Sequence, residues 1–183
     1  AGRTTSYISE NGCSVVGVDI SEPLIKKAKD LYPDIDFRAM DARKLDFKDN
    51  VFDTVFFSFN GIDNLAFLEE RDRAMNEMKI VLKIGGFLIY SSHNALAIPR
   101  TKTSWKIIFN NLGKLRIGHH WRSEEYNFGK LTQYYNNLWN EKARLRLLGF
   151  KNVEAVGNSA KILKAPDLVL AFLDKFPIYI AQK

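Results

Sequence analysis

The stretch VVGVDIS, residues 15–21, decides the fold class of this 183-residue chain. Its three valines are β-branched, and such a run predicts a short buried strand. The strand ends on a carboxylate, Asp19, and Ser21 follows as a good N-cap for a helix. An unpaired carboxylate is costly to bury, so Asp19 must reach water or meet hydrogen-bond donors. The partner of Asp19 is therefore the question that the rest of the sequence has to answer.

Outward from this stretch, helical and extended patterns alternate as far as Asn94. The helical patterns cover residues 2–12, 22–31 and 65–83. The extended patterns cover residues 14–19, 35–40, 52–60 and 85–92. This alternation predicts an α/β fold with a mainly parallel sheet. Residues 52–60 are nearly all apolar, which predicts a strand that is covered on both faces.

Residues 94–131 break the alternation. Four apolar residues between Trp105 and Leu112 have the spacing of one amphipathic helix. Residues 94–122 hold six of the 27 basic residues and no acidic residue, which leaves 21 basic residues to balance the 21 acidic ones elsewhere. This segment therefore accounts for the net charge of +6. The alternation then resumes with a predicted helix over residues 138–148 and predicted strands over residues 151–156 and 176–183.

Composition excludes several classes of protein. The length suits one domain with a sizeable core, and no apolar run is long enough to cross a bilayer. The first ten residues lack the basic and apolar regions of a signal peptide. Cys13 is the only cysteine, so no internal disulfide forms, which fits a cytoplasmic location. One thiol and three histidines do not predict a structural zinc site, and we expect no metal.

Five segments carry a resemblance to a known family. They are AGRTT at residues 1–5, the strand that ends at Asp19, MDARKLDF at 40–47, FDTVFFSFNGIDNL at 52–65 and VLKIGGFLIYSSHN at 81–94. In this order they resemble the class I S-adenosylmethionine-dependent methyltransferases of the small-molecule, methyltransferase type 11-like kind. The resemblance covers residues 1–93 well and residues 132–183 more loosely. Ile84 stands where the family has a proline.

The resemblance implies a Rossmann-like, doubly wound α/β fold. Its mostly parallel sheet would have an antiparallel C-terminal strand, and a helical lid would be inserted. Residues 1–183 would form a single methyltransferase domain, with a core over 1–93 and 132–183 and a lid over 94–131. The family's first strand and the first glycines of its cofactor loop are absent from this chain, so we expect further residues of a longer protein to precede Ala1.

The resemblance also implies that S-adenosylmethionine is the cofactor. Asp19 would accept hydrogen bonds from both ribose hydroxyls at the carboxyl end of its strand, which answers the opening question. Ile20 would pack on the adenine ring. Asp41 would accept from the adenine amino group, and the backbone N–H of Ala42 would donate to the ring.

Three further residues would border the rest of the cofactor. Gly2 would let the backbone approach the cofactor closely, and the N-terminus of the following helix would favour the cofactor's carboxylate. Ser58 and Phe59 would border the methionine part through backbone groups.

The predicted reaction moves a methyl group to an O, N or C atom of a small molecule, mainly through positioning and exclusion of water. No residue is assigned as the catalytic base. The candidates on the acceptor side are His93, Asn60 and Tyr126. Tyr126 is included because residues 124–135 are expected to bring the lid back over the site. The basic lid indicates an acidic or phosphorylated acceptor.

Other interpretations fit the same residues. In a nicotinamide-binding Rossmann domain, an acidic residue at the end of the second strand also holds a ribose, although the Asp-Ala pair at 41–42 and the VLKIGG turn favour the methyltransferase. Residues 94–122 would also suit nucleic acid or an anionic membrane surface, and a lid is the preferred interpretation. Without the other family-like segments, Asp19 would be interpreted as an ordinary helix N-cap. Asp41 would be interpreted as the first residue of a turn. The sequence leaves the oligomeric state open.

Overall fold

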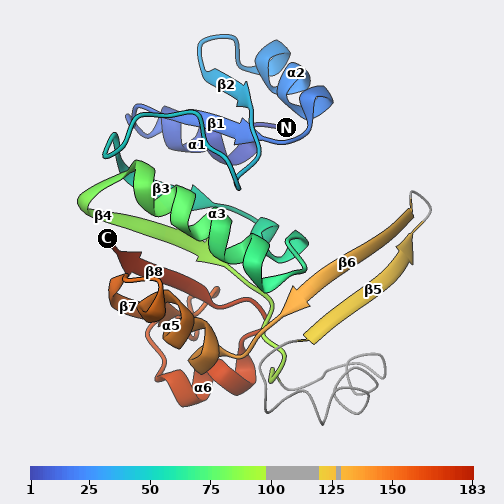
Figure 1. Cartoon of the computed structure of the whole chain (residues 1–183), viewed down its shortest axis with the longest axis vertical. Helices are drawn as coiled ribbons and strands as arrows, with labels where there is room; N and C mark the ends of the chain where they lie inside the picture. Colours follow the sequence, from blue (N-terminus) through green and yellow to red (C-terminus); the bar gives the residue numbers. More distant parts are fainter. Residues whose placement is uncertain (98–119, 127–128) are drawn as a thin grey trace. The chain divides into compact units, whose positions relative to one another are not determined.

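The computed structural model describes residues 1–97, 120–126 and 129–183. These residues form two compact units, Ala1–Lys48 (unit 1) and Asp49–Lys183 (unit 2). Figure 1 shows their helices and strands, coloured by position along the sequence. The predicted amphipathic helix near residues 105–112 lies outside the described residues. Within the described residues, no helix has the length and apolar character needed to span a membrane. That the whole chain is one methyltransferase domain stays a prediction.

Unit 1 contains two β-strands and two α-helices. They are α1 (Arg3–Glu10), β1 (Val16–Asp19), α2 (Glu22–Leu31) and β2 (Asp36–Ala39). The two strands pair in parallel, with Val16 opposite Asp36 and Asp19 opposite Ala39. The hydroxyl of Ser21 accepts a hydrogen bond from the Leu24 N–H at 3.4 Å, so Ser21 is the N-cap of α2. The predicted strand, cap and helix around residues 15–21 are therefore confirmed.

The core of unit 1 is small. Its buried side chains are Ile25, Ala28 and Phe37, and Tyr32 and Ile35 pack against them. Gly17 of β1 faces this core, since a Cβ atom placed on it would lie 2.3 Å from the Phe37 ring. Close packing of β1 on Phe37 therefore depends on the absence of a side chain at residue 17.

Unit 2 is built on a mixed four-stranded sheet in the order β3-β4-β8-β7. The strands are β3 (Phe52–Phe57), β4 (Leu82–Ser91), β7 (Lys151–Val156) and β8 (Ile178–Gln182). β3 and β4 pair in parallel, whereas β8 runs antiparallel to both of its neighbours. The predicted strands and the antiparallel C-terminal strand are confirmed.

The helices of unit 2 pack against this sheet. They are the 3₁₀ helix η1 (Gly61–Asn64) and the α-helices α3 (Leu68–Val81), α5 (Leu138–Leu147) and α6 (Asp167–Leu173). α3 contacts β4 and α5 contacts β7. Phe56 of β3 keeps 46% of its surface exposed, so the prediction that this strand is covered on both faces is wrong. None of the six residues of β3 is fully buried.

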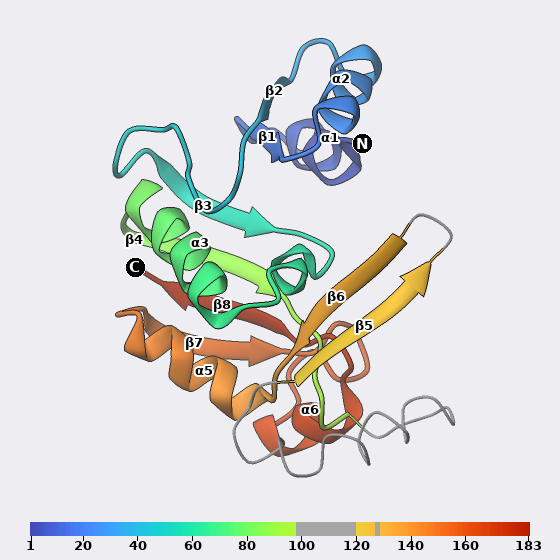
Figure 2. The ribbon, with the colours of Figure 1, turned by 45° about the vertical axis from the view of Figure 1, so that its right-hand side comes forward.

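A β-hairpin occupies part of the segment that we predicted as a helical lid. It pairs β5 (His120–Tyr126) with β6 (Gly129–Tyr135) in antiparallel register. Figure 2 shows the hairpin extending away from the four-stranded sheet of the same unit. Its base is tied to the end of β4, because the Asn136 N–H donates to the His93 carbonyl at 3.2 Å and the Ala95 N–H donates to the Asn136 carbonyl at 2.7 Å.

The packing of Gly17 generates a stability prediction. Gly17→Ala pushes a methyl group into the Phe37 ring, and overpacking of this kind costs about 1–3 kcal/mol of unfolding free energy. Gly61→Ala is the matched control, because its new Cβ would meet only ordinary contacts at 3.7 Å. Urea denaturation followed by circular dichroism measures both variants. Equal midpoints for the two would contradict the packing of β1 on Phe37.

Candidate functional site

Asp19 ends β1 at the carboxyl edge of the strand pair in unit 1, and its side chain is exposed. One carboxylate oxygen accepts the N–H of Ser21 at 2.9 Å. The described residues place no hydrogen-bond donor on the other oxygen. Because Ser21 and not Asp19 caps α2, the carboxylate of Asp19 keeps an open oxygen for a ligand.

Asp41 has a different environment. Its Oδ1 accepts the Arg43 N–H at 2.8 Å, and its Oδ2 accepts Arg43 Nη2 at 2.6 Å. Arg43 Nε lies 3.0 Å from both oxygens. The guanidinium and the backbone of Arg43 therefore already occupy Asp41, so an adenine amino group would have to share this carboxylate with Arg43.

Gly2 and Ile20 flank the helices of unit 1. Gly2 has a φ of 72°, and a Cβ atom on it would lie 2.9 Å from the Tyr32 ring and 3.0 Å from Phe37. Packing and backbone conformation thus explain this glycine without a ligand. Ile20 follows Asp19 and is 67% exposed, so it offers an apolar surface next to the open carboxylate oxygen.

In unit 2, the loop after β3 has an unusual backbone. Phe59 and Asn60 are consecutive non-glycine residues, and both have a φ of 53°. The left-handed conformation costs about 1–2 kcal/mol per residue, and such strain is concentrated at functional sites. The Asn60 N–H donates to the hydroxyl of Ser91 at 3.2 Å, which joins the carboxyl ends of β3 and β4. The side-chain oxygen of Asn60 is buried and has no hydrogen-bond partner in the described structure.

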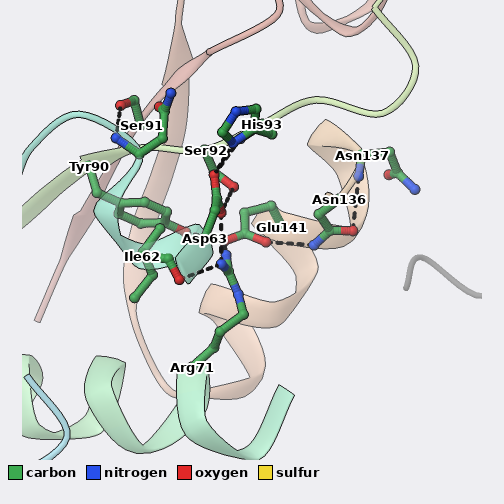
Figure 3. Close-up of polar contacts among 11 residues, drawn as sticks. Ile62, Asp63, Arg71, Tyr90, Ser91, Ser92, His93, Asn136, Asn137 and Glu141 are labelled. Atoms are coloured by element: carbon green, nitrogen blue, oxygen red, sulfur yellow. Dashed lines mark hydrogen bonds and ion pairs between the residues drawn. The ribbon is translucent and has the colours of Figure 1, made fainter. Parts of the chain in front are cut away.

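Asp63 of η1 is the centre of the hydrogen bonds at this sheet edge (Figure 3). It is fully buried. Its Oδ1 accepts the Ser92 hydroxyl at 2.6 Å and Arg71 Nη1 at 2.8 Å. Its Oδ2 accepts the backbone N–H of His93 at 2.7 Å and lies 2.7 Å from His93 Nδ1. Asp63 therefore fixes the end of β4 and the ring of His93 together.

Arg71 of α3 bridges two buried carboxylates. Its Nη1 binds Asp63, and its Nη2 lies 2.8 Å from Glu141 Oε1 on α5. The same Nη1 donates to the Ile62 carbonyl at 2.9 Å. Burial alone would lower the pKa of Arg71, but the charges of Glu141 and Asp63 raise this pKa above the usual value of an arginine. Arg71 is thus held in its charged form.

Polar groups also surround Glu141. The Tyr90 hydroxyl donates to Oε1 at 2.6 Å, and Asn136 Nδ2 donates to Oε2 at 2.5 Å. Burial and the negative charge of Glu141 raise the pKa of Tyr90 well above its usual value, so this hydroxyl stays a donor. The ring of Tyr134 lies 4.3 Å from the Arg71 guanidinium carbon. Groups on η1, α3, β4, β6 and α5, together with Asn136 after β6, therefore surround Arg71 and Glu141.

His93 follows β4 and is one of the predicted acceptor-side residues. Its ring centroid lies 4.7 Å from that of Tyr135 and 5.1 Å from that of Phe176. Tyr135, opposite His120 at the base of the hairpin, is the tyrosine beside His93. Tyr126 pairs with Gly129 at the tip of the hairpin, and its place on the acceptor side stays a prediction.

Sequence reasoning missed three charged residues of this site: Asp63, Arg71 and Glu141. Two of them carried a signal. Arg71 lies three residues after Leu68 and four before Met75, and so occupies the apolar stripe of its helix. Glu141 is placed in the same way between Leu138 and Leu145. A charge at a core position requires a buried partner. Among the described residues, no group of three or more His, Cys, Asp or Glu side chains is placed to hold a metal ion.

Comparison with known proteins finds a family match in the N-terminal part of the chain. Residues 1–90 match the family model described as a methyltransferase domain. The matched residues make up just under half of the chain. The match starts at the first residue of the chain and ends within β4, so it includes Asp19 and the loop after β3. The predicted resemblance to class I S-adenosylmethionine-dependent methyltransferases is confirmed.

Curated relatives and solved structures agree with this methyltransferase family. A demethylmenaquinone methyltransferase from Renibacterium salmoninarum is 41% identical over 102 residues, 55% of this chain and 41% of the relative. A phosphatidylethanolamine N-methyltransferase from Cereibacter sphaeroides is 34% identical over 88 residues, 45% of this chain and 41% of the relative. The aligned part of the chain therefore spans less than half the length of these relatives.

The fold is shared with solved methyltransferase structures. An S-adenosylmethionine-dependent methyltransferase from Methanosarcina mazei superposes with a TM-score of 0.70 at 17% sequence identity, over 98% of this chain and 86% of that one. The CcbJ methyltransferase from Streptomyces caelestis also reaches 0.70, at 15% identity, over 99% of this chain and 79% of that one. The predicted Rossmann-like α/β fold is confirmed.

The buried ion pairs of unit 2 generate a stability prediction. Arg71→Met leaves Asp63 and Glu141 buried without their cation, and breaking a buried pair in this way costs about 3–5 kcal/mol of unfolding free energy. The matched control is Lys83→Met, which removes a pair with Asp53 whose side chains are 47% and 84% exposed. In urea denaturation we expect a much lower midpoint for Arg71→Met and an unchanged midpoint for Lys83→Met. Equal midpoints would contradict the role of Arg71.

Proposed function

We propose that this protein transfers the methyl group of S-adenosylmethionine to an O, N or C atom of a small molecule. The observation that carries the proposal is the carboxylate of Asp19, which is exposed at the carboxyl end of β1 and has one oxygen open. Ligands of open α/β sheets bind outside the carboxyl ends of the strands. The family match over residues 1–90 supports the proposal.

We infer candidate cofactor-binding residues in each unit separately. In unit 1, Asp19 would accept the ribose hydroxyls and the exposed Ile20 would cover one face of the adenine. The backbone N–H of Ala42 would donate to the adenine ring. Asp41 would receive the adenine amino group only by sharing its lone pairs with Arg43.

In unit 2, the buried oxygen of Asn60 needs a donor, and a ligand ammonium or hydroxyl group would satisfy it. Ser58 and Phe59 would border the methionine part of the cofactor through their backbone groups. Gly2 would begin the helix whose N-terminus favours the cofactor's carboxylate, although the Tyr32 and Phe37 contacts also explain this glycine.

When bound, the cofactor supplies a methyl group that its sulfonium centre already activates. The protein then has to hold the acceptor in line with this group and exclude water. Asn60 and His93 lie at the carboxyl edge of β3 and β4, which is the acceptor side in our proposal.

The relatives do not identify one acceptor, because they are named for two different ones, demethylmenaquinone and phosphatidylethanolamine. We infer a small-molecule acceptor. The proposal of an acidic acceptor rests on the basic residues of 94–122, most of which lie outside the described residues. The exposed, unpaired Cys13 is consistent with the predicted cytoplasmic location.

Calorimetric titration with S-adenosylhomocysteine tests the proposal on the intact protein. Asp19→Ala removes hydrogen bonds to a charged acceptor, which are worth about 1.5–3 kcal/mol, so affinity should fall about 10- to 100-fold. The matched control is Asp36→Ala, since Asp36 begins β2 opposite Val16 and binds Arg38. We expect the control to bind as the wild type does.

The same titration separates the methyltransferase from the nicotinamide-binding alternative. Wild-type protein should bind S-adenosylhomocysteine and not NAD. Binding of NAD alone, or equal affinity for S-adenosylhomocysteine in Asp19→Ala and wild type, would contradict the proposal.

A further inference from the structure

We propose that His93 is a general base for methyl transfer, that Asp63 is its positioning residue, and that the acceptor is a phenolic hydroxyl. This inference rests on the proposed methyltransferase function. It assigns a base to the site and narrows the acceptor from any O, N or C atom to one chemical class. Four features of the structure carry it: the geometry of the Asp63–His93 contact, the charge around it, its position, and the rings beside it.

The first feature is the tautomer that Asp63 imposes on His93. Asp63 receives the Ser92 hydroxyl, the Arg71 guanidinium and the His93 backbone N–H, all of which are donors. A carboxylate held by donors alone is an acceptor, so the His93 Nδ1 at 2.7 Å must carry the hydrogen. In the neutral ring, Nε2 is then left with a lone pair. The described residues give Nε2 no hydrogen-bond partner.

The second feature is the charge of the buried cluster. It contains two carboxylates, Asp63 and Glu141, and one guanidinium, Arg71, so it carries one excess negative charge. A proton taken up by His93 neutralises this excess, because the resulting imidazolium lies against Asp63. The imidazolium that forms in the step is therefore paired with a carboxylate.

The third feature is the position of His93. It follows β4 at the sheet edge where the strained Phe59-Asn60 loop leaves β3, and the Ser91 hydroxyl ties the two strand ends together. The side chain of His93 is 15% exposed, so the ring is mostly buried and a small part of it is accessible to solvent. The side-chain oxygen of Asn60 at the same edge has no hydrogen-bond partner in the described structure, so it is a second polar group that could accept a hydrogen bond from a ligand.

The fourth feature is the aromatic surroundings of the imidazole. Tyr135 and Phe176 lie 4.7 and 5.1 Å from it, centroid to centroid. Aromatic side chains bind flat rings through stacked or edge-on contacts. A flat acceptor with a hydroxyl on its ring would therefore meet both a surface that suits the ring and a base that suits the hydroxyl.

In the proposed step, His93 Nε2 accepts the proton of the phenolic hydroxyl. An electron pair of the phenolic oxygen forms the new O–C bond to the methyl group of the sulfonium donor, the C–S bond breaks, and its electron pair stays on sulfur. The imidazolium remains paired with Asp63 and later releases its proton to water. Base catalysis of this type contributes about 10²- to 10⁴-fold in rate.

The groups that face His93 are one carboxylate and two aromatic rings. From η1 the facing group is the Asp63 carboxylate, from β6 it is the Tyr135 ring, and from the loop before β8 it is the uncharged Phe176 ring. Behind Asp63 lie Arg71 on α3 and Glu141 on α5. An imidazole acts as a base only when it is neutral, so kcat should fall on the acid side of the profile.

The first test reads the tautomer without any reaction. The chain has three histidines, and His93→Gln identifies the signals of residue 93 in a long-range ¹H–¹⁵N spectrum of histidine-labelled intact protein. The proposal predicts a neutral ring protonated on Nδ1 and unprotonated on Nε2. A ring protonated on Nε2 would overturn it. Because wild-type protein gives the answer, the result does not depend on whether an Asp63 variant folds.

The second test uses S-adenosylmethionine with a deuterated methyl group and a small-molecule extract of the source cells. Mass spectrometry and NMR identify the labelled product, which should carry its label on a phenolic oxygen. With that acceptor, His93→Gln should lower kcat about 100-fold or more, abolish the acid limb of the pH profile and leave S-adenosylhomocysteine affinity unchanged. Asp53→Asn is the control and should keep wild-type kcat, since Asp53 is an exposed residue at the start of β3.

The outcomes separate this inference from the proposed function. Label on nitrogen or carbon, or wild-type kcat in His93→Gln, would overturn the inference while the methyltransferase function stands. Failure of the wild type to bind S-adenosylhomocysteine would overturn the proposed function. The assignment of His93 as a base would then be overturned too, even if NMR showed the predicted tautomer.

Discussion

The bridge that Arg71 makes between Asp63 and Glu141 is the interaction on which unit 2 depends. Two ionised carboxylates and a guanidinium are buried together, and each of these charges is costly to remove from water unless it is paired and hydrogen-bonded. The hydroxyls of Tyr90 and Ser92 and the amide of Asn136 complete the pairing. The bridge thereby holds α3, α5, η1 and the end of β4 in one arrangement, and this arrangement fixes the backbone where β3 and β4 end.

Unit 1 depends on a simpler constraint. Its two short strands carry a small core, in which Phe37 packs against the bare backbone of Gly17. The same parallel pairing places Asp19 at the carboxyl end of β1 opposite Ala39. The capping of α2 by Ser21 leaves that carboxylate half satisfied. A local turn and a local cap thus determine that the charge remains available, and no long-range contact of Asp19 is needed.

The sequence predicted the parts of this structure that local rules determine. Apart from η1, α6 and the hairpin, the strands and helices of units 1 and 2 follow from the sequence patterns, and Ser21 caps α2 as its residue type predicts. The cluster around Asp63 was not predicted, because Arg71 and Glu141 are 70 residues apart and pair only when the sheet forms. The hairpin was also missed, since its strands are polar and lack the apolar alternation by which strands are recognised. The positions of the cofactor-binding residues on the chain were predicted by family resemblance, and their roles stay predictions.

The central claim is that the open carboxylate at the end of β1 binds the sugar of the cofactor. A crystal structure of the intact protein with S-adenosylhomocysteine tests it most directly. The account predicts both ribose hydroxyls within about 2.5–2.7 Å of the Asp19 carboxylate, the range of hydroxyl–carboxylate hydrogen bonds. A bound ligand whose ribose contacts other residues, with Asp19 bonded only to Ser21, would contradict it.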